Sequence, residues 1–403
     1  MSMLVAPRAA VLAGRGGLSI AILAVAAFVI VTTEYLIVGL LPALARDLGI
    51  SISAAGQLVT LFAFTVMLFG PVPTVLLSHV ECKRLFVVIL LIFAVSNAPA
   101  AMAPNLWVLA VARFIPALAL PVFWGTASET AGQLVEPQRA GRAVLQVYLG
   151  ISAALLFGIP LGTLVSEAIG WRGALWGLAG LSLLMALALT RCMPAMARPP
   201  RLRIGEQARI LRNPEFIAQV LLSVLVFTAM FTAYTYLADT LERVAAVAPA
   251  RVGWWLMGFG AIGLVGNWFG GRLVDRNPLG ATAFFSLLLA LGMAASVPLA
   301  GAAMPLGLAL AVWGIAYTAL FPVCQVRVMH SASQAQALAG TLNVSAANAG
   351  TGLGAILGGL AISLWGLESV GYVAAGIASA AVLVAMSMRS MGTRYRTSTR
   401  PRG

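Results

Sequence analysis

Long apolar stretches separated by short polar gaps run along almost the whole chain. A helix of about 20 mostly apolar residues crosses the hydrocarbon core of a bilayer, because its backbone satisfies its own hydrogen bonds there. The pattern predicts twelve such helices, near residues 18–43, 53–78, 85–103, 106–133, 140–166, 172–192, 215–240, 251–274, 280–300, 304–329, 337–363 and 367–388. The expected fold class is therefore an all-α membrane protein with twelve transmembrane helices.

Composition and charge support this prediction and orient the helices. Hydrophobic residues make up 61% and charged residues 9% of the sequence, whereas about a quarter of the residues in a soluble domain are charged. Most of the 25 Lys and Arg residues lie at the termini and in alternate gaps, including Arg327 in the tenth gap. Because basic loops resist translocation, both termini and the sixth gap are expected in the cytoplasm. The net charge of +13 then reflects topology and contacts with membrane lipids, and nucleic acid is not an expected partner.

The chain divides into two similar halves joined by an Arg- and Pro-rich segment. The predicted domains are a cytoplasmic N-terminal tail (1–17), an N-terminal six-helix bundle (18–192), a cytoplasmic linker (193–214), a C-terminal six-helix bundle (215–388) and a cytoplasmic basic tail (389–403). When Gly162 is aligned with Gly359, other positions of the two halves also match. The linker is expected to hold a short amphipathic helix around Ile204 to Leu211 on the membrane surface, or to be a disordered tether.

Two charged residues are predicted inside the membrane at matching depth. Glu34 in the first helix and Arg113 in the fourth lie roughly 13 and 10 Å from the outer ends of their helices, at 1.5 Å per residue. Burial favours a neutral carboxyl group and a nearby cation favours the charged one, so such an acid can load and release a proton. We expect Glu34 and Arg113 to act in proton coupling. The alternatives are a structural carboxylate or a permanent ion pair that holds two helices together.

Small residues cluster on the fifth predicted helix, at Gly150, Gly158, Pro160 and Gly162. Glycine lets helices approach closely in lipid, and proline removes one backbone hydrogen bond and bends the helix. The pattern fits ordinary tight packing of helices, and it equally fits a contact between helices that move against each other.

These segments together resemble the motifs of the drug and metabolite:proton antiporters of the major facilitator superfamily. The likeness rests on Glu34 in its first-helix segment, on Arg113, and on the glycines and proline of the fifth helix. A more specific likeness, to bacterial exporters of purine nucleosides, sugars or chloramphenicol-type drugs, rests on the block that contains Phe123 and Trp124. The resemblance implies the major facilitator fold with two six-helix pseudo-repeats.

The chain departs from the family pattern in two places. Pro116 and Ala117 replace the usual Gln and Gly that follow the fourth-helix arginine. The gap between the second and third helices keeps only the basic pair Lys83 and Arg84, whereas the corresponding gap of the second half keeps Asp275 and Arg276. We expect Lys83, Arg84, Asp275 and Arg276 to act in gating. Glu129 is expected to act with them and to contact the basic loop at Arg139 and Arg142.

Aromatic and polar residues in the central parts of the helices are candidates for the substrate cavity, since the apolar surroundings give polar groups few partners. The candidates are Tyr35, Phe62, Phe123, Trp124, Gln146, Tyr148, Phe231, Tyr234, Trp313, Tyr317 and Asn343.

The resemblance implies a bacterial inner-membrane protein, monomeric, that exports a small organic molecule in exchange for protons. A proton-coupled uptake symporter of the same fold would use similar residues and stays open. A channel would need a continuous polar path, and an enzyme would need a convergent catalytic cluster; neither is expected. We expect no cofactor and no metal, because Cys82, Cys192 and Cys324 are far apart, and no ATP-binding loop is present.

Overall fold

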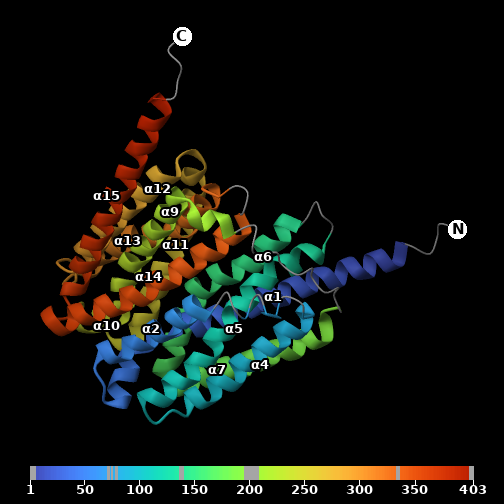
Figure 1. Cartoon of the computed structure of the whole chain (residues 1–403). Helices are drawn as coiled ribbons and strands as arrows, with labels where there is room; N and C mark the ends of the chain where they lie inside the picture. The colour runs from blue at the N-terminus through green and yellow to red at the C-terminus, as the bar shows by residue number, and fades with distance from the viewer. Residues whose placement is uncertain are drawn as a thin grey trace. The chain divides into compact units, whose positions relative to one another are not determined.

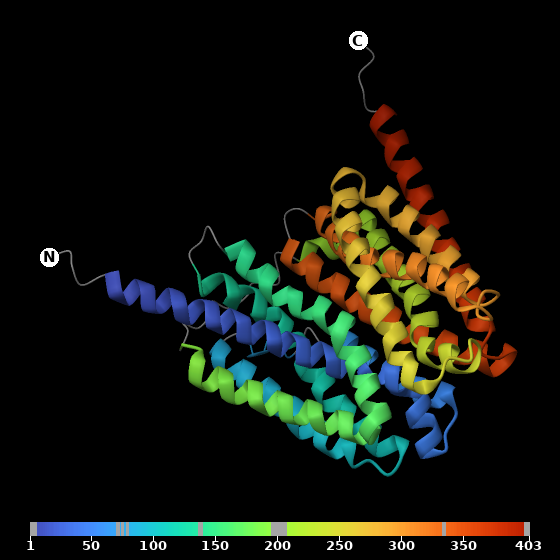
Figure 2. The ribbon, with the colours of Figure 1, turned by 180° about the vertical axis from the view of Figure 1, so that it is seen from behind.

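The computed structural model describes residues 6–69, 73, 76–77, 80–135, 140–194, 208–332 and 336–398. Within these residues every regular element is a helix (Figures 1 and 2). Eleven helical segments of this part of the chain are long and apolar enough to cross a membrane. The predicted all-α membrane class is confirmed.

The helices of the first half follow the predicted order. They are α1 (Ala6–Leu48), α2 (Ile52–Phe69), α4 (Cys82–Ala101), α5 (Leu106–Gln133), α6 (Ala140–Ala153), a π-helical turn η2 (Ala154–Gly158) and α7 (Ile159–Cys192). The start of α5 is fixed by Asn105, whose side-chain oxygen accepts a hydrogen bond from Val108 N at 3.1 Å. This satisfies one of the backbone N–H groups that a helix leaves unpaired at its first turn.

The second half contains η3 (Ala208–Arg212), α9 (Pro214–Tyr234), α10 (Leu237–Arg243), α11 (Pro249–Arg276), α12 (Pro278–Ser296), α13 (Ala303–His330), α14 (Gln336–Trp365) and α15 (Ser369–Ser398). Asn213 and Asn277 cap α9 and α12, and each is followed by a proline at the first helical position. Proline is suited to that position because it lacks the N–H that would stay unpaired. Cap and proline together explain why these two helices begin where they do.

The ends of the chain are more helical than the predicted tails. The backbone of α1 begins at Ala6, inside the predicted tail 1–17, and α15 continues to Ser398. Most of the linker, including the first half of the segment from Ile204 to Leu211, lies outside the described residues, so its predicted amphipathic helix stays a prediction. Only the short η3 is described near its end.

One candidate span, from Leu149 to Cys192, has 44 residues. At about 1.5 Å per residue it is roughly twice as long as a hydrocarbon core of about 30 Å requires. It contains most of the predicted fifth helix (140–166) and all of the predicted sixth (172–192), and Gly170 interrupts it with φ 81° and ψ 158°. Glycine adopts this conformation without the clash that a Cβ would cause.

Contacts divide the chain into two compact units. The first unit comprises Met1–Ile50 and Leu68–Leu202, and in it α7 packs against α1 and α4. The second comprises Ser51–Met67 and Arg203–Gly403, and in it α14 packs on α9, while α13 packs on α11 and α12. Although α2 comes early in the sequence, it belongs to the second unit, where the Thr60 hydroxyl donates to Gly352 O at 3.3 Å.

Candidate functional site

Arg113 binds the backbone of α1 at the turn that carries Glu34. Its Nη1 donates to Thr33 O at 3.1 Å and its Nη2 donates to Glu34 O at 2.8 Å. The arginine is 3% exposed, so its charge lies inside the first unit. The Tyr35 side chain hydrogen-bonds the Glu34 carboxyl group, which lies within electrostatic reach of the guanidinium. The structure therefore brings together the two charges that the sequence placed at equal depth.

The sequence prediction missed Asn97, which completes this buried polar cluster. Asn97 lies on α4 and its Nδ2 donates to the Thr33 hydroxyl at 3.4 Å, while that hydroxyl donates to Val29 O at 2.9 Å. Asn97 and Thr33 are both buried. An amide in an otherwise apolar helix needs a partner inside the membrane, and that signal could have identified Asn97.

The predicted glycines of the fifth helix lie against α1. A Cβ at Gly150 would meet the backbone at Ala24, one at Gly158 would meet Thr32, and one at Gly162 would meet Leu36. These α1 residues recur at multiples of four and share one face of the helix. Glu34 is two residues from Thr32 and from Leu36, so it lies on the opposite face. One face of α1 therefore packs against the glycine positions of α6, η2 and α7. Arg113 binds α1 near the opposite face.

The π-helical turn η2 lies where this packing is closest. It ends at Gly158, two residues before Pro160. A proline has no N–H to donate and its ring displaces the preceding turn, while a π-helical turn accommodates one extra residue in a helix. Such turns are frequent at functional sites.

In the second unit, four of the predicted substrate residues form one aromatic cluster. Tyr234 and Tyr317 have ring centroids 4.5 Å apart, and Phe231 lies 5.9 Å from Tyr234. The ring of Phe259 lies 5.5 Å from the ring of Trp313 and also contacts the rings of both tyrosines. Phe231, Tyr234, Trp313 and Tyr317 are all buried. Phe231, Tyr234 and Tyr317 contact one another directly, and Trp313 joins them through Phe259.

The cluster continues along α13 to a pair of amides. Phe321 lies 5.5 Å from Tyr317 and is half-buried. One turn further, the Gln325 Oε1 accepts a hydrogen bond of 2.7 Å from the Nδ2 of Asn343 on α14. The sequence singled out Asn343 and missed Gln325, because a glutamine close to a helix end gives no sign of which neighbour it faces.

Of the remaining substrate candidates, Tyr35 belongs to the polar cluster, because its side chain hydrogen-bonds the Glu34 carboxyl group. Phe62 is buried in α2, and Phe123 is buried with its ring 5.5 Å from Phe86 and 5.1 Å from Trp124. Tyr35 is half-buried, whereas Gln146 is exposed on α6. The side chain of Tyr148 lies outside the described residues.

The predicted gating residues are only partly described. Arg84 forms a salt bridge of 3.1 Å with Glu81, and Lys83 is half-buried at the start of α4. Arg276 is exposed at the end of α11. The side chains of Glu129 and Asp275 lie outside the described residues, so their gating contacts stay predictions.

The prediction that Arg327 lies in a loop is wrong. It belongs to α13, is 2% exposed, and donates through Nη1 to Gln219 O at 3.0 Å and through Nη2 to the Ser223 hydroxyl at 2.8 Å. Its Nη1 also donates to the Gln219 side-chain oxygen. Residue counting fails here because an arginine near a helix end can turn inward as well as outward when the neighbouring helix offers acceptors.

The break in α7 is tied to the end of α1 by polar contacts. Trp171 Nε1 donates to Asp47 Oδ2 at 3.2 Å, and Arg172 forms a salt bridge with the same oxygen. Arg172 Nη2 also donates to Ala103 O, just after α4, at 3.1 Å. These contacts hold the chain in place where Gly170 changes its direction.

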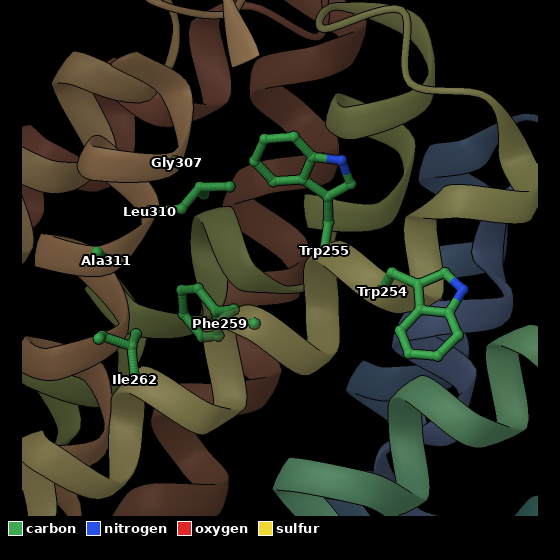
Figure 3. Close-up of a pocket in the computed structure, with 8 residues that line it drawn as sticks. Trp254, Trp255, Phe259, Ile262, Gly307, Leu310 and Ala311 are labelled. Carbon is green, nitrogen blue, oxygen red and sulfur yellow. The ribbon is translucent and has the colours of Figure 1, made fainter. Parts of the chain in front are cut away.

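A cavity of about 430 Å³ lies between α11 and α13 in the second unit. Figure 3 shows Trp255 and Phe259 on the side of α11 nearest to Leu310, while Trp254 points away. Phe259 also belongs to the aromatic cluster. The lining consists of aromatic, aliphatic and glycine residues, so the cavity suits an apolar group and offers little hydrogen bonding.

Apolar helices long enough to span a membrane, with a half-buried acid beside a buried arginine, are typical of a membrane transporter. Residues 23–347 match the profile of the Major Facilitator Superfamily, and the chain belongs to that family. As a member it is a transporter and not an enzyme.

Known relatives cover most of the chain. It is 35% identical to the inner membrane transport protein YdhP of Escherichia coli over 372 residues, 91% of this chain and 95% of the relative. It is 36% identical to a chloramphenicol efflux pump of Mycobacterium tuberculosis over 355 residues, 85% of each protein. It is 28% identical to a probable sugar efflux transporter of Helicobacter acinonychis over 353 residues, 87% of this chain and 90% of the relative.

Solved structures share the fold at low sequence identity. The nucleoside transporter NupG matches with a TM-score of 0.75 and 14% identity, over 92% of this chain and 99% of that one. A bacterial homologue of the human lysosomal transporter Spinster matches with a TM-score of 0.72 and 16% identity, over 93% and 95%.

Proposed function

We propose that this protein exports a small organic molecule, such as a drug, a nucleoside or a sugar-like metabolite, across the bacterial inner membrane in exchange for protons. The names of the relatives support export, since they include a chloramphenicol efflux pump and a probable sugar efflux transporter. The relative from Escherichia coli is an inner membrane protein by name.

The observation that carries the proton-coupling part is the position of Arg113. Two of its N–H groups bind backbone carbonyl oxygens, and carbonyls accept hydrogen bonds whether Glu34 is charged or neutral. A buried guanidinium without partners would be costly. Arg113 can therefore stay in place while the Glu34 carboxyl group gains and loses a proton.

Exchange then follows from competition at Glu34. A proton that arrives from outside neutralises the carboxyl group as the substrate leaves, and release of the proton to the cytoplasm restores the charge before the next substrate binds. Alternating access of two halves around a central site is the usual means in transporters built from repeats.

The proposed topology has twelve transmembrane helices in two six-helix repeats, with both termini in the cytoplasm and the protein acting as a monomer. The length of the segment from Leu149 to Cys192 and its break at Gly170 support two spans within it. The distribution of Lys and Arg supports the orientation.

Glu34→Gln tests the coupling. In proteoliposomes with an imposed pH gradient and chloramphenicol or a sugar as the transported probe, Glu34→Gln should abolish uphill transport and keep exchange down a substrate gradient. Glu368→Gln makes the same chemical change at an exposed position between α14 and α15 and should transport normally. Undiminished uphill transport by Glu34→Gln would refute the proposal. If the substrate instead accumulates in the direction in which protons flow, the protein is an uptake symporter.

A further inference from the structure

A hydrogen bond between the side-chain amides of Gln325 and Asn343 joins α13 to α14. Asn343 Nδ2 donates to Gln325 Oε1 at 2.7 Å, and the Gln325 amide lies against Gly340, where a Cβ would be 2.9 Å from its Nε2. Gly340 and Asn343 are three residues apart and so share one face of α14. The absence of a side chain at Gly340 therefore leaves room for the glutamine amide beside α14.

Each of the two side-chain amides has one polar atom without a good hydrogen-bond partner. Asn343 is 3% exposed, and its Oδ1 has no hydrogen-bond partner among the described residues. The Gln325 Nε2 donates only a long contact of 3.7 Å to Met329 Sδ among those that the structure shows. A thioether is a weak acceptor, and buried polar groups are normally paired. One acceptor and one donor on two hydrogen-bonded side chains therefore lack a good partner among the described residues.

An aromatic surface adjoins these two groups. Phe321 precedes Gln325 by four residues on α13, so the two side chains share a face. The ring of Phe321 is held at 5.2 Å from Phe227 and 5.5 Å from Tyr317, and it is half-buried. A planar ring of a ligand could lie on this surface while its polar group reaches the amides.

The charge around the pair is low. Both amides are neutral, and Arg327, two residues from Gln325, directs its Nη groups toward Gln219 and Ser223 on α9. A charged ligand group would lose its hydration here without gaining a partner of opposite charge. The pair therefore favours a neutral group that both donates and accepts.

We propose that Phe321, Gln325 and Asn343 form a substrate subsite for neutral aromatic molecules that carry an amide or a hydroxyl group. The ligand donates a hydrogen bond to Asn343 Oδ1, accepts one from Gln325 Nε2, and places its ring against Phe321. This assignment rests on the proposed export function and names the class of molecule exported. The cavity of Figure 3 lies at the other end of the aromatic cluster and offers no comparable polar pair.

Binding to the purified full-length protein, measured by isothermal titration calorimetry, tests the subsite without a proton gradient. The probes are two matched pairs, N-acetyl-L-tryptophanamide with 3-methylindole and benzamide with toluene. Each amide should bind the unmodified protein at least about tenfold more tightly than its parent ring, since the two hydrogen bonds contribute about 0.5–1.5 kcal/mol each. Tryptamine, which carries a positive charge, should bind more weakly than N-acetyl-L-tryptophanamide.

Asn343→Leu and Gln325→Met remove the two polar groups and keep the side-chain bulk. Each variant should lower the preference for the amide by about two- to tenfold, because it removes one of the two hydrogen bonds. Binding of the parent ring should stay unchanged, which also reports that the protein is folded. Asn348→Leu is the control, since Asn348 is buried on the same helix but donates to Val344 O of its own helix at 3.0 Å.

An amide preference that is unchanged in both Asn343→Leu and Gln325→Met, or no preference in the unmodified protein, would overturn the subsite. So would tighter binding of tryptamine. These outcomes are independent of Glu34, because failure of the export proposal would appear as proton-independent transport and would leave the binding preferences intact.

Discussion

The packing of α6 on α1 makes a sharp prediction at Gly150. A Cβ there would lie 2.9 Å from the Ala27 Cβ and 3.1 Å from Phe28 N, and it would come closest to the Ala24 carbonyl oxygen. Favourable carbon contacts are about 3.5–4.0 Å. Two of these neighbours are backbone atoms that cannot rotate away, so Gly150→Ala must push the two helices apart by roughly 0.5–1 Å.

The magnitude follows from two opposing effects. Overpacking of this kind costs about 1–3 kcal/mol, while replacing glycine by alanine within a helix gains about 0.8–1 kcal/mol. Gly177→Ala on α7 supplies the second effect alone, since nothing lies within 4 Å of a Cβ at that position. The difference in unfolding free energy between the two variants should be about 1–3 kcal/mol, with Gly150→Ala the less stable.

The assay is equilibrium unfolding of the purified variants in detergent by added denaturant, read by tryptophan fluorescence. The comparison is between two glycine-to-alanine changes in membrane helices, so the contribution of helix propensity cancels. Equal stability of Gly150→Ala and Gly177→Ala would show that α6 and α1 are not in close contact in the protein, and the reasoning from the glycine pattern would fail.

Three further predictions concern buried or tethering contacts. Ser223→Ala leaves one N–H of the buried Arg327 without its acceptor, and thermal unfolding should show a loss of about 1–3 kcal/mol. Tyr236→Phe removes the hydroxyl that donates to Ala355 O at 2.7 Å and keeps the ring, so the same measurement should show a smaller loss of about 0.5–1.5 kcal/mol; a larger loss than in Ser223→Ala would contradict this order. Asp47→Asn weakens a partly exposed pair with Arg172, and stability should fall by less than about 1 kcal/mol at low salt and by almost nothing at high salt.

The two halves of the sequence carry different residues at positions that the predicted repeat would pair. In the alignment that pairs Gly162 with Gly359, Glu34 corresponds to Phe231 and Arg113 corresponds to Leu310. The first unit holds Glu34 and Arg113 with Asn97 and Thr33, whereas the second holds the buried Arg327, the aromatic cluster and the amide pair.

Several site residues could be found from the sequence for a clear reason. A charge or an amide in an apolar helix is costly, so Glu34, Arg113 and Asn343 were conspicuous. Asn97 obeyed the same rule and could have been found. Arg327 misled the prediction because its distance along the chain from a helix end does not reveal whether it points inward.

The all-helical membrane class, the order of the helices and the presence of charge within them follow from the sequence alone, because apolar length and intramembrane cost are properties of local stretches. The neighbours of each side chain, in contrast, follow from how the helices pack. That packing binds Arg113 to the carbonyls of Thr33 and Glu34, collects Tyr234 and Tyr317 into one cluster, and sets Gln325 beside Asn343. Those pairings depend on the rotation of each helix about its axis, which is fixed by packing against other helices and is not encoded in any single stretch.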